Sequence, residues 1–147
     1  MPNKATIARA RRDKKEGKSA STQAGEFVRQ EIDTIREGKH GARNTKQAIA
    51  IGLSEARRAG VGLKQPKKGS VSEQTRENAK RDTEKSKKHT PVNKSRSQAR
   101  VKALKKESTA AASPRALSQQ ARSAAAKRSA SDRSASAKKA ARTRAGR

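Results

Sequence analysis

The last part of this chain combines a high positive charge with almost no large apolar residues. From Lys85 to Arg147 there are nineteen Lys and Arg, two acids (Glu107 and Asp132), and a net charge of +17. Most of the other residues are Ala and Ser, so too little apolar surface can be buried to offset the loss of chain entropy on folding. We therefore expect a polyanionic partner, bound by phosphate neutralisation with counterion release. A tail that only kept the protein soluble would not need one sign of charge at this density.

The composition of the whole chain limits the size of any core. The 147 residues carry a net charge of +26 and are 29% hydrophobic, with one Phe and no Trp, Tyr or Cys. Such values are typical of disordered chains, so the folded part is expected to be small. The lack of Cys excludes disulfides and thiolate metal sites. No apolar run approaches the roughly 20 residues that a membrane-spanning helix needs.

The sequence offers nothing that resembles catalytic machinery. It contains no Gly-rich phosphate loop and no nucleophile beside a base, and His40 and His89 have no partner at ligand spacing. A small core also leaves no rigid scaffold for a concave site. We therefore expect no catalytic residues, no metal and no cofactor, and a protein that is not an enzyme.

Residues 21–63 are the part with helical periodicity. Val28, Ile32 and Ile35 follow the i, i+4, i+7 spacing of one helix face, and Phe27 flanks it. Because Phe27 is alone and lies beside this seam, we expect it in the core and not in a stack with nucleic-acid bases.

The ends of two helices can be placed in this segment. Ser21 or Thr22 is an expected N-cap of the first helix, and Gly38 stands where a left-handed residue ends it. Asn44 followed by Gln47 indicates a capping box that opens a second helix, which ends at Gly60. The predicted unit is a helical hairpin, which is marginal alone and which dimerisation through the same seam would complete.

The predicted fold is therefore all-α: a small hairpin of two amphipathic helices with largely disordered flanks. The expected divisions are a basic disordered arm over 1–20, the hairpin over 21–63, a charged linker with one exposed helix over 64–94, and a basic tail over 95–147. Ala, Lys and Arg favour helix once their charge is neutralised, so the tail is expected to become helical only when bound. Ser113 followed by Pro114 marks one helix start there.

The candidate nucleic-acid contacts are the cations of the arm, the hairpin loop and the tail, which would bind phosphates with little reading of bases. They are Arg9, Arg11, Arg12, Lys39, Arg43, Lys46, Lys102, Lys105, Lys106, Arg122, Lys127, Arg128, Arg133, Lys138, Lys139, Arg142 and Arg144. A helix-turn-helix is disfavoured, because the connection over 38–43 is longer than the usual turn of three to four residues.

Two stretches resemble known proteins. GEFVRQEIDTIREGKHGARNTKQAIAIGLSEARRAGVGL, with KSAST before it, resembles a family of small, strongly basic bacterial proteins of unestablished function. Members are sometimes labelled DNA-binding or plasmid-stabilisation proteins. The ending RALSQQARSAAAKRSASDRSASAKKAARTRAGR is similar to the tails of linker-histone-like bacterial proteins. The resemblance implies a bacterial protein and supplies no catalytic residues.

Three functions fit these observations. The first is sequence-nonspecific binding of nucleic acid, with DNA favoured over RNA, in an architectural role at the bacterial nucleoid in the cytoplasm. The second is an RNA- or ribosome-associated basic protein. In the third, residues 21–63 dock onto another protein and the tail is a nucleic-acid anchor. A homodimer through residues 21–63 is expected as a further partner, and a membrane is not.

Overall fold

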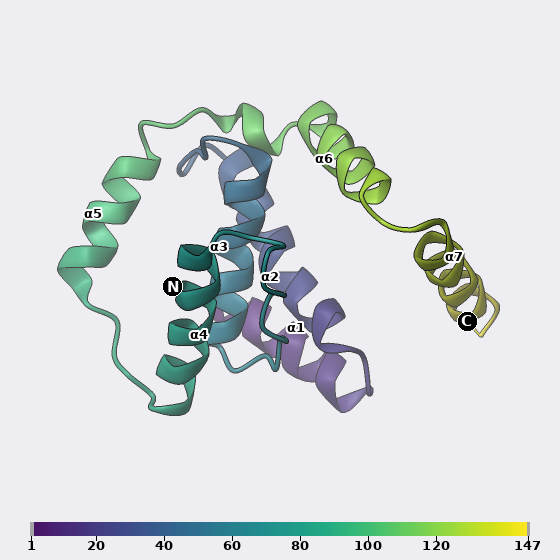
Figure 1. Cartoon of the computed structure of the whole chain (residues 1–147). Coiled ribbons are helices and arrows are strands. Elements are labelled where there is room, and N and C mark those ends of the chain that lie inside the picture. The colour runs from purple at the N-terminus through teal and green to yellow at the C-terminus, as the bar shows by residue number, and fades with distance from the viewer. Residues whose placement is uncertain (1, 147) are drawn as a thin grey trace. The chain divides into compact units, whose positions relative to one another are not determined.

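The computed structural model describes residues 2–146 (Figure 1). Apart from one isolated β-bridge between Lys68 and Val71, the regular structure of these residues is helical. The helices are α1 (Lys4–Lys15), α2 (Ala20–Arg36), α3 (Thr45–Arg58), α4 (Glu73–Lys87), α5 (Lys94–Leu104), the 3₁₀ helix η1 (Thr109–Ala112), α6 (Pro114–Ala126) and α7 (Ala130–Ala145). The chain forms two compact units, one up to Ala112 and the C-terminal unit from Ser113; within the first, we call α1–α4 and the segments that join them the bundle.

Helices α2 and α3 form the centre of the bundle. Phe27 and Ile35 of α2 and Ala48 of α3 have no exposed surface, which confirms the prediction that Phe27 is a core residue. The two backbones approach closely at Gly52, where a Cβ atom would lie 2.6 Å from the Cα of Val28. Small residues on α3 thus let the large side chains of α2 pack against its backbone.

The ends of these helices follow from local chemistry. The Asn44 side chain accepts a hydrogen bond from the Gln47 amide at 2.9 Å, and the Gln47 side chain accepts one from the Arg43 amide at 2.7 Å. The predicted capping box is therefore confirmed, with Gln47 reaching one residue further back than usual. Gly38 has φ of +74°, as predicted, whereas α2 has its N-cap at Ser19, two to three residues before the predicted cap.

The predicted two-helix hairpin with disordered flanks is wrong, because the flanking segments are helical and the bundle contains four packed helices. Helix α1 lies across α2 and buries Thr6, Ala10 and Asp13. These residues follow the i, i+4, i+7 rule, but because they are small or polar they leave no apolar stripe in the sequence. An ion pair of 2.6 Å between Arg9 and Glu26 links α1 to α2.

Helix α4 packs against α3, and a buried carboxylate of α4 forms part of this contact. Asp82 accepts hydrogen bonds from the Ser54 hydroxyl at 2.5 Å and from the Arg58 guanidinium at 2.8 Å. Ala79, one turn earlier, is also buried. The scarcity of apolar residues in this segment predicts an exposed helix. It gives no sign of the polar partners through which α4 docks.

The chain then leaves the bundle as α5 and returns in a segment that we call the strap, residues 104–112. Figure 1 shows α5 standing apart from α1–α4, and Leu104 is the one buried residue of this helix. Leu104, Ala111 and Ala112 of the strap are buried against the bundle, where η1 packs on α2 and α3. The strap therefore closes the end of the α2–α3 pair.

The C-terminal unit consists of α6 and α7, so the prediction of a disordered tail is also wrong. Ser113 caps α6 with Pro114 in the first turn, as predicted, and Ser129 caps α7. Neither helix contains a buried residue. Their helicity thus follows from the caps and from the high helix propensity of Ala, Arg and Lys, without help from packing.

Candidate nucleic-acid interface

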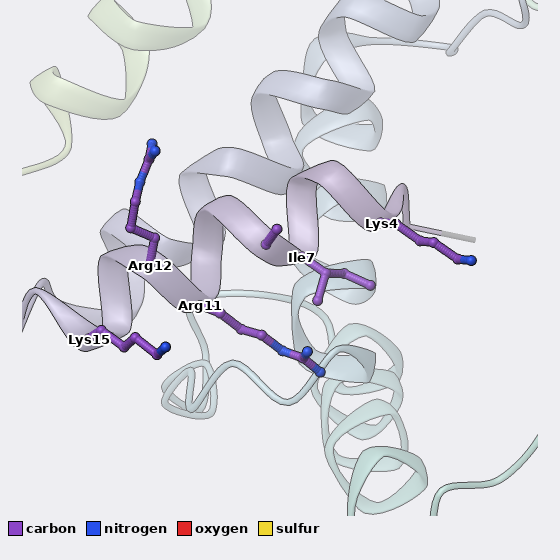
Figure 2. A pocket seen from close by; sticks show the side chains of 6 residues that line it. Lys4, Ile7, Arg11, Arg12 and Lys15 are labelled. Carbon is purple, nitrogen blue, oxygen red and sulfur yellow. The ribbon is translucent and has the colours of Figure 1, made fainter.

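The solvent-facing side of α1 carries a row of cations that we call the α1 stripe: Lys4, Arg11, Arg12 and Lys15. Lys4, Arg11 and Lys15 are spaced by seven and four residues, which puts them on one side of the helix, with Arg12 beside them. Together with Ile7 and Ala8 they line a shallow recess of about 640 Å³ (Figure 2). Arg11 and Lys15 extend to the same side of the helix in this view.

The three residues of α1 that were predicted to contact nucleic acid do not all lie on the same side of the helix. Arg11 and Arg12 belong to the α1 stripe, whereas Arg9 faces α2, where it binds Glu26 and donates to the Thr6 hydroxyl at 3.0 Å. Arg9 therefore holds α1 in place. Lys4 and Lys15 were missing from the predicted contacts, and the helical spacing from Arg11 would have identified both.

A second basic group surrounds the start of α3. Arg43 and Lys46 are exposed on either side of the cap residue Asn44, and neither side chain forms an ion pair within residues 2–146. Lys39 is also exposed, but its Nζ atom lies 2.6 Å from Oε2 of Glu37, so this acid partly neutralises its charge. Of the loop cations, Arg43 and Lys46 are the ones left for an outside anion.

A third group lies on α5, where Lys102 and Lys105 border a shallow recess of about 340 Å³ with Ser97, Gln98 and Val101. Lys106 is the second residue after the end of the helix and is exposed. Helix α5 contains no acidic residue.

The C-terminal unit presents the remaining predicted contacts, and all of them are exposed. Those on or next to α6 are Arg122, Lys127 and Arg128, and those on α7 are Arg133, Lys138, Lys139, Arg142 and Arg144. Their spacing distributes the charge around each helix, because it does not match the helical repeat. Arg128 is bound locally, since it donates to the carbonyl of Asp132 at 3.1 Å. Asp132 is the one acid between Ser113 and Gly146, and it lies in the first turn of α7, where the helix dipole favours a negative charge.

Several acids of the bundle make contacts that hold the fold together. Asp13 binds Lys18 at 2.7 Å, and this hydrogen bond raises the pKa of Lys18. Asp82 binds Arg58, and desolvation lowers the pKa of the neighbouring Arg57, whose Nε atom is buried without a hydrogen-bond partner in the described residues. The carboxylates of Asp13 and Asp82 are therefore buried and paired within the fold.

A buried carboxylate lies beneath the loop between α2 and α3. Glu31 of α2 is 4% exposed, and its Oε1 atom is 3.5 Å from Nε2 of His40. Desolvation raises the pKa of Glu31, although the attraction of His40 opposes the shift. Desolvation likewise raises the pKa of Glu55 on α3. His40 also contacts the Gly41 carbonyl through Nδ1 at 3.0 Å, so the pair links the loop to α2.

Two further features are absent from residues 2–146. No cluster of three or more His, Asp or Glu side chains is placed to hold a metal ion. None of the helices in this range has both the length and the apolar character to cross a membrane.

Comparison with known proteins gives a family match for the segment that contains α1, α2 and α3. Residues 3–69 match a family of unknown function (DUF6496). This range contains α1, α2, α3 and the loop that the strap covers, and it supports the resemblance to an uncharacterised family. The match carries no information on DNA binding or plasmid stabilisation. Neither a curated protein nor a solved structure matches the chain significantly.

Proposed function

We propose that this protein binds nucleic acid through phosphate contacts, without sequence selection and with DNA favoured over RNA. The observation that carries the proposal is the charge of the exposed helices. From Ser113 to Gly146 there are nine Lys and Arg and one acid, in a unit whose two helices contain no buried residue. A polyanion supplies the counter-charge that the fold itself does not.

The first unit carries further exposed cations of its own, in the α1 stripe and on α5. Both groups line shallow recesses on the outer side of a helix. Among these cations, Arg12 has an acid nearby, because its Nε atom lies 4.0 Å from Oε1 of Glu16. Such exposed single-sign rows attract phosphates over several ångströms and set no requirement on the base sequence.

The aromatic content favours backbone contact over base stacking. The single aromatic side chain of the protein, Phe27, is fully buried between α1, α2 and α3. Proteins that bind single strands usually stack bases on several exposed aromatic rings. This supports duplex DNA as the favoured partner, for which we propose an architectural role at the bacterial nucleoid.

Binding to RNA or the ribosome is the alternative, because rRNA presents the same phosphate chemistry. A homodimer through residues 21–63 remains a prediction as well. Since Phe27 and Ile35 are already buried in one copy, such a dimer would have to use the loop or the outward residues of this segment.

The test is the salt dependence of binding to a DNA duplex. If about eight cations neutralise phosphates, log affinity falls with log salt concentration with a slope near −7, at about −0.9 per phosphate. Changing Arg133, Lys138, Lys139, Arg142 and Arg144 of α7 to Gln should then make the slope shallower by about 4. A slope shallower than about −3 for the unaltered protein contradicts the proposal.

The matched control is the double variant Arg76→Gln/Arg81→Gln. These cations lie on α4 and already pair with Glu73 at 2.9 Å and with Glu77 at 3.7 Å, so their loss should leave the slope nearly unchanged. Competition between duplex DNA and rRNA at one salt concentration decides the partner. A preference for rRNA of more than about tenfold, or 1.4 kcal/mol, favours the RNA alternative.

A further inference from the structure

Most of the cations of α7 lie in two pairs on nearly opposite sides of the helix. An α-helix turns by about 100° per residue, so Arg133 and Arg144, eleven residues apart, lie almost on one line. Lys138 and Arg142, four residues apart, lie together on the other side. All four side chains are exposed. We call the first pair the arginine flank and the second pair the lysine flank.

The two sides that separate these flanks differ in charge. One of them, which we call the uncharged side, carries the small residues Ala130, Ser134, Ala137, Ala141 and Ala145. The other, which we call the outer side, carries Asp132, Ser136 and Thr143. A polyanion that approached the outer side would meet the carboxylate of Asp132. The charges of α7 therefore favour approach of a polyanion to the uncharged side.

The distance between the flanks fits one groove of duplex DNA. An α-helix with its side chains is about 10–12 Å across. The major groove of B-DNA is about 12 Å wide, whereas the minor groove is about 6 Å wide. A helix in the major groove has a phosphate chain on each side, so one duplex can neutralise both flanks at once. If each flank bound a separate duplex, two densely charged duplexes would be held only one helix diameter apart.

Helix α7 is free to enter a groove, because none of its residues is buried. The side chains of Ala and Ser on the uncharged side are short, so they let the backbone come close to the base pairs. They also lack the bidentate donors with which Arg, Asn or Gln distinguish one base from another. Binding by this side therefore needs no particular base sequence.

We propose that α7 binds in the major groove of duplex DNA. Its uncharged side faces the base pairs, its two flanks face the two phosphate chains, and its outer side faces solvent. This inference rests on the proposed function and assigns it a groove and an orientation. It also distinguishes DNA from RNA, because the major groove of an RNA duplex is deep and too narrow for side chains to read.

Two full-length variants test the orientation. Ala141→Glu places a carboxylate on the uncharged side, and Thr143→Glu places one on the outer side, two residues away. Both variants lower the net charge by the same amount, so an effect of charge without direction acts equally on both. We expect Ala141→Glu to bind a DNA duplex more than about tenfold more weakly than Thr143→Glu, because like charges brought together in an interface repel strongly.

Two adjacent lysines provide a second matched pair. Lys138 belongs to the lysine flank, whereas Lys139 lies beside the outer side. Lys138→Gln should make the slope of log affinity against log salt concentration shallower by about 0.9, the value of one phosphate contact. Lys139→Gln should leave the slope nearly unchanged. Far-UV circular dichroism, with and without DNA, checks that all four variants keep the helical content of the unaltered protein.

Chemical protection of the DNA identifies the groove. Dimethyl sulfate methylates guanine N7, which lies in the major groove, and adenine N3, which lies in the minor groove. The unaltered protein should protect guanine N7, and Ala141→Glu should reduce this protection. Protection of adenine N3 with guanine N7 left reactive would overturn the proposal.

Equal affinities of Ala141→Glu and Thr143→Glu for DNA would overturn it as well. This result is expected if each flank binds a different duplex, because the two substituted positions are then equivalent. An RNA duplex should not distinguish the two variants, and a tenfold difference on RNA would also contradict groove binding. A steep salt dependence without any difference between the variants leaves the proposed function intact and removes this inference alone. Failure of the unaltered protein to bind duplex DNA contradicts both.

Discussion

Two glycines in the interiors of helices have opposite structural roles. Gly52 of α3 faces α2, where an added Cβ would lie 2.6 Å from the Val28 Cα and 2.9 Å from its nitrogen. Gly25 of α2 is exposed, and an added Cβ there would have no neighbour within 4 Å. The first glycine sets the distance between two helices, and the second only weakens the helix that contains it.

This contrast gives a paired prediction. Gly52→Ala should destabilise the bundle by about 1–3 kcal/mol, because two backbones must move apart to admit one methyl group. Gly25→Ala should stabilise it by about 0.5–1 kcal/mol through helix propensity. Thermal melting followed at 222 nm measures both, since the chain has no Trp or Tyr. Equal shifts in the same direction would show that α2 and α3 do not touch at Gly52.

Glu31 makes folding sensitive to pH, and the direction follows from its raised pKa. At pH values below its ordinary pKa of 4.5, the carboxyl is protonated in both the folded and the unfolded chain. As the pH rises through the higher pKa of the folded state, the folded chain must hold a desolvated charge that the unfolded chain holds in water. Glu31 therefore favours folding at low pH and opposes it at neutral pH.

Glu31→Gln tests this assignment. The difference in unfolding free energy between variant and wild type should be small near pH 4 and should move in favour of the variant as the pH rises to about 7. Urea unfolding at several pH values measures the difference. Glu84→Gln on α4 removes the same charge at an exposed position and is the control. A difference that does not change with pH would assign Glu31 a packing role alone.

At the scale of elements, the bundle is held together by short contacts between helices of low hydropathy. Helix α1 contributes Thr6, Ala10 and Asp13 to its interface, and α4 contributes Ala79 and Asp82. Neither helix has the large apolar face that would stabilise it alone. Both form because α2 and α3 present matching small surfaces and charged partners.

Truncation separates the contributions of these elements. A chain ending at Ala112 should melt at the same temperature as the full protein, because α6 and α7 bury no residue. A chain ending at Lys68 loses α4 and the strap. This loss exposes apolar surface on α3 and removes Asp82, the partner of Arg58. The shorter chain should therefore melt at a much lower temperature than the full protein. Equal melting temperatures for the two truncated chains would show that α4 and the strap do not stabilise the α2–α3 pair.

Across the whole molecule, acids and bases are distributed unequally. Twelve of the thirteen acids lie before Ser113, and several of them bind cations across helix interfaces, as in Arg9–Glu26 and Arg58–Asp82. The C-terminal unit has no such interface and holds a single acid. Its charge is thus free of any folding requirement, which is why the salt dependence proposed above should be concentrated there.

Local sequence features determined much of the secondary structure around the core. The capping box at Asn44, the left-handed Gly38 and the Ser113–Pro114 start are all present, because each depends on residues within one helical turn. The burial of Phe27 also followed from sequence, since one aromatic residue beside an apolar seam has a single favourable place. The exposure of the cations could likewise be predicted from composition and helical spacing.

Only the tertiary structure determined how the segments that flank α2 and α3 pack against them. The assignment of Arg9 to an ion pair, the docking of α1 and α4, and the strap all depend on partners distant in sequence. Burial of Ala, Thr and Asp leaves no signal in hydropathy, because these residues are buried only when a neighbour fits them. The strap leaves even less, since its recognised groups are main-chain carbonyls that every residue possesses.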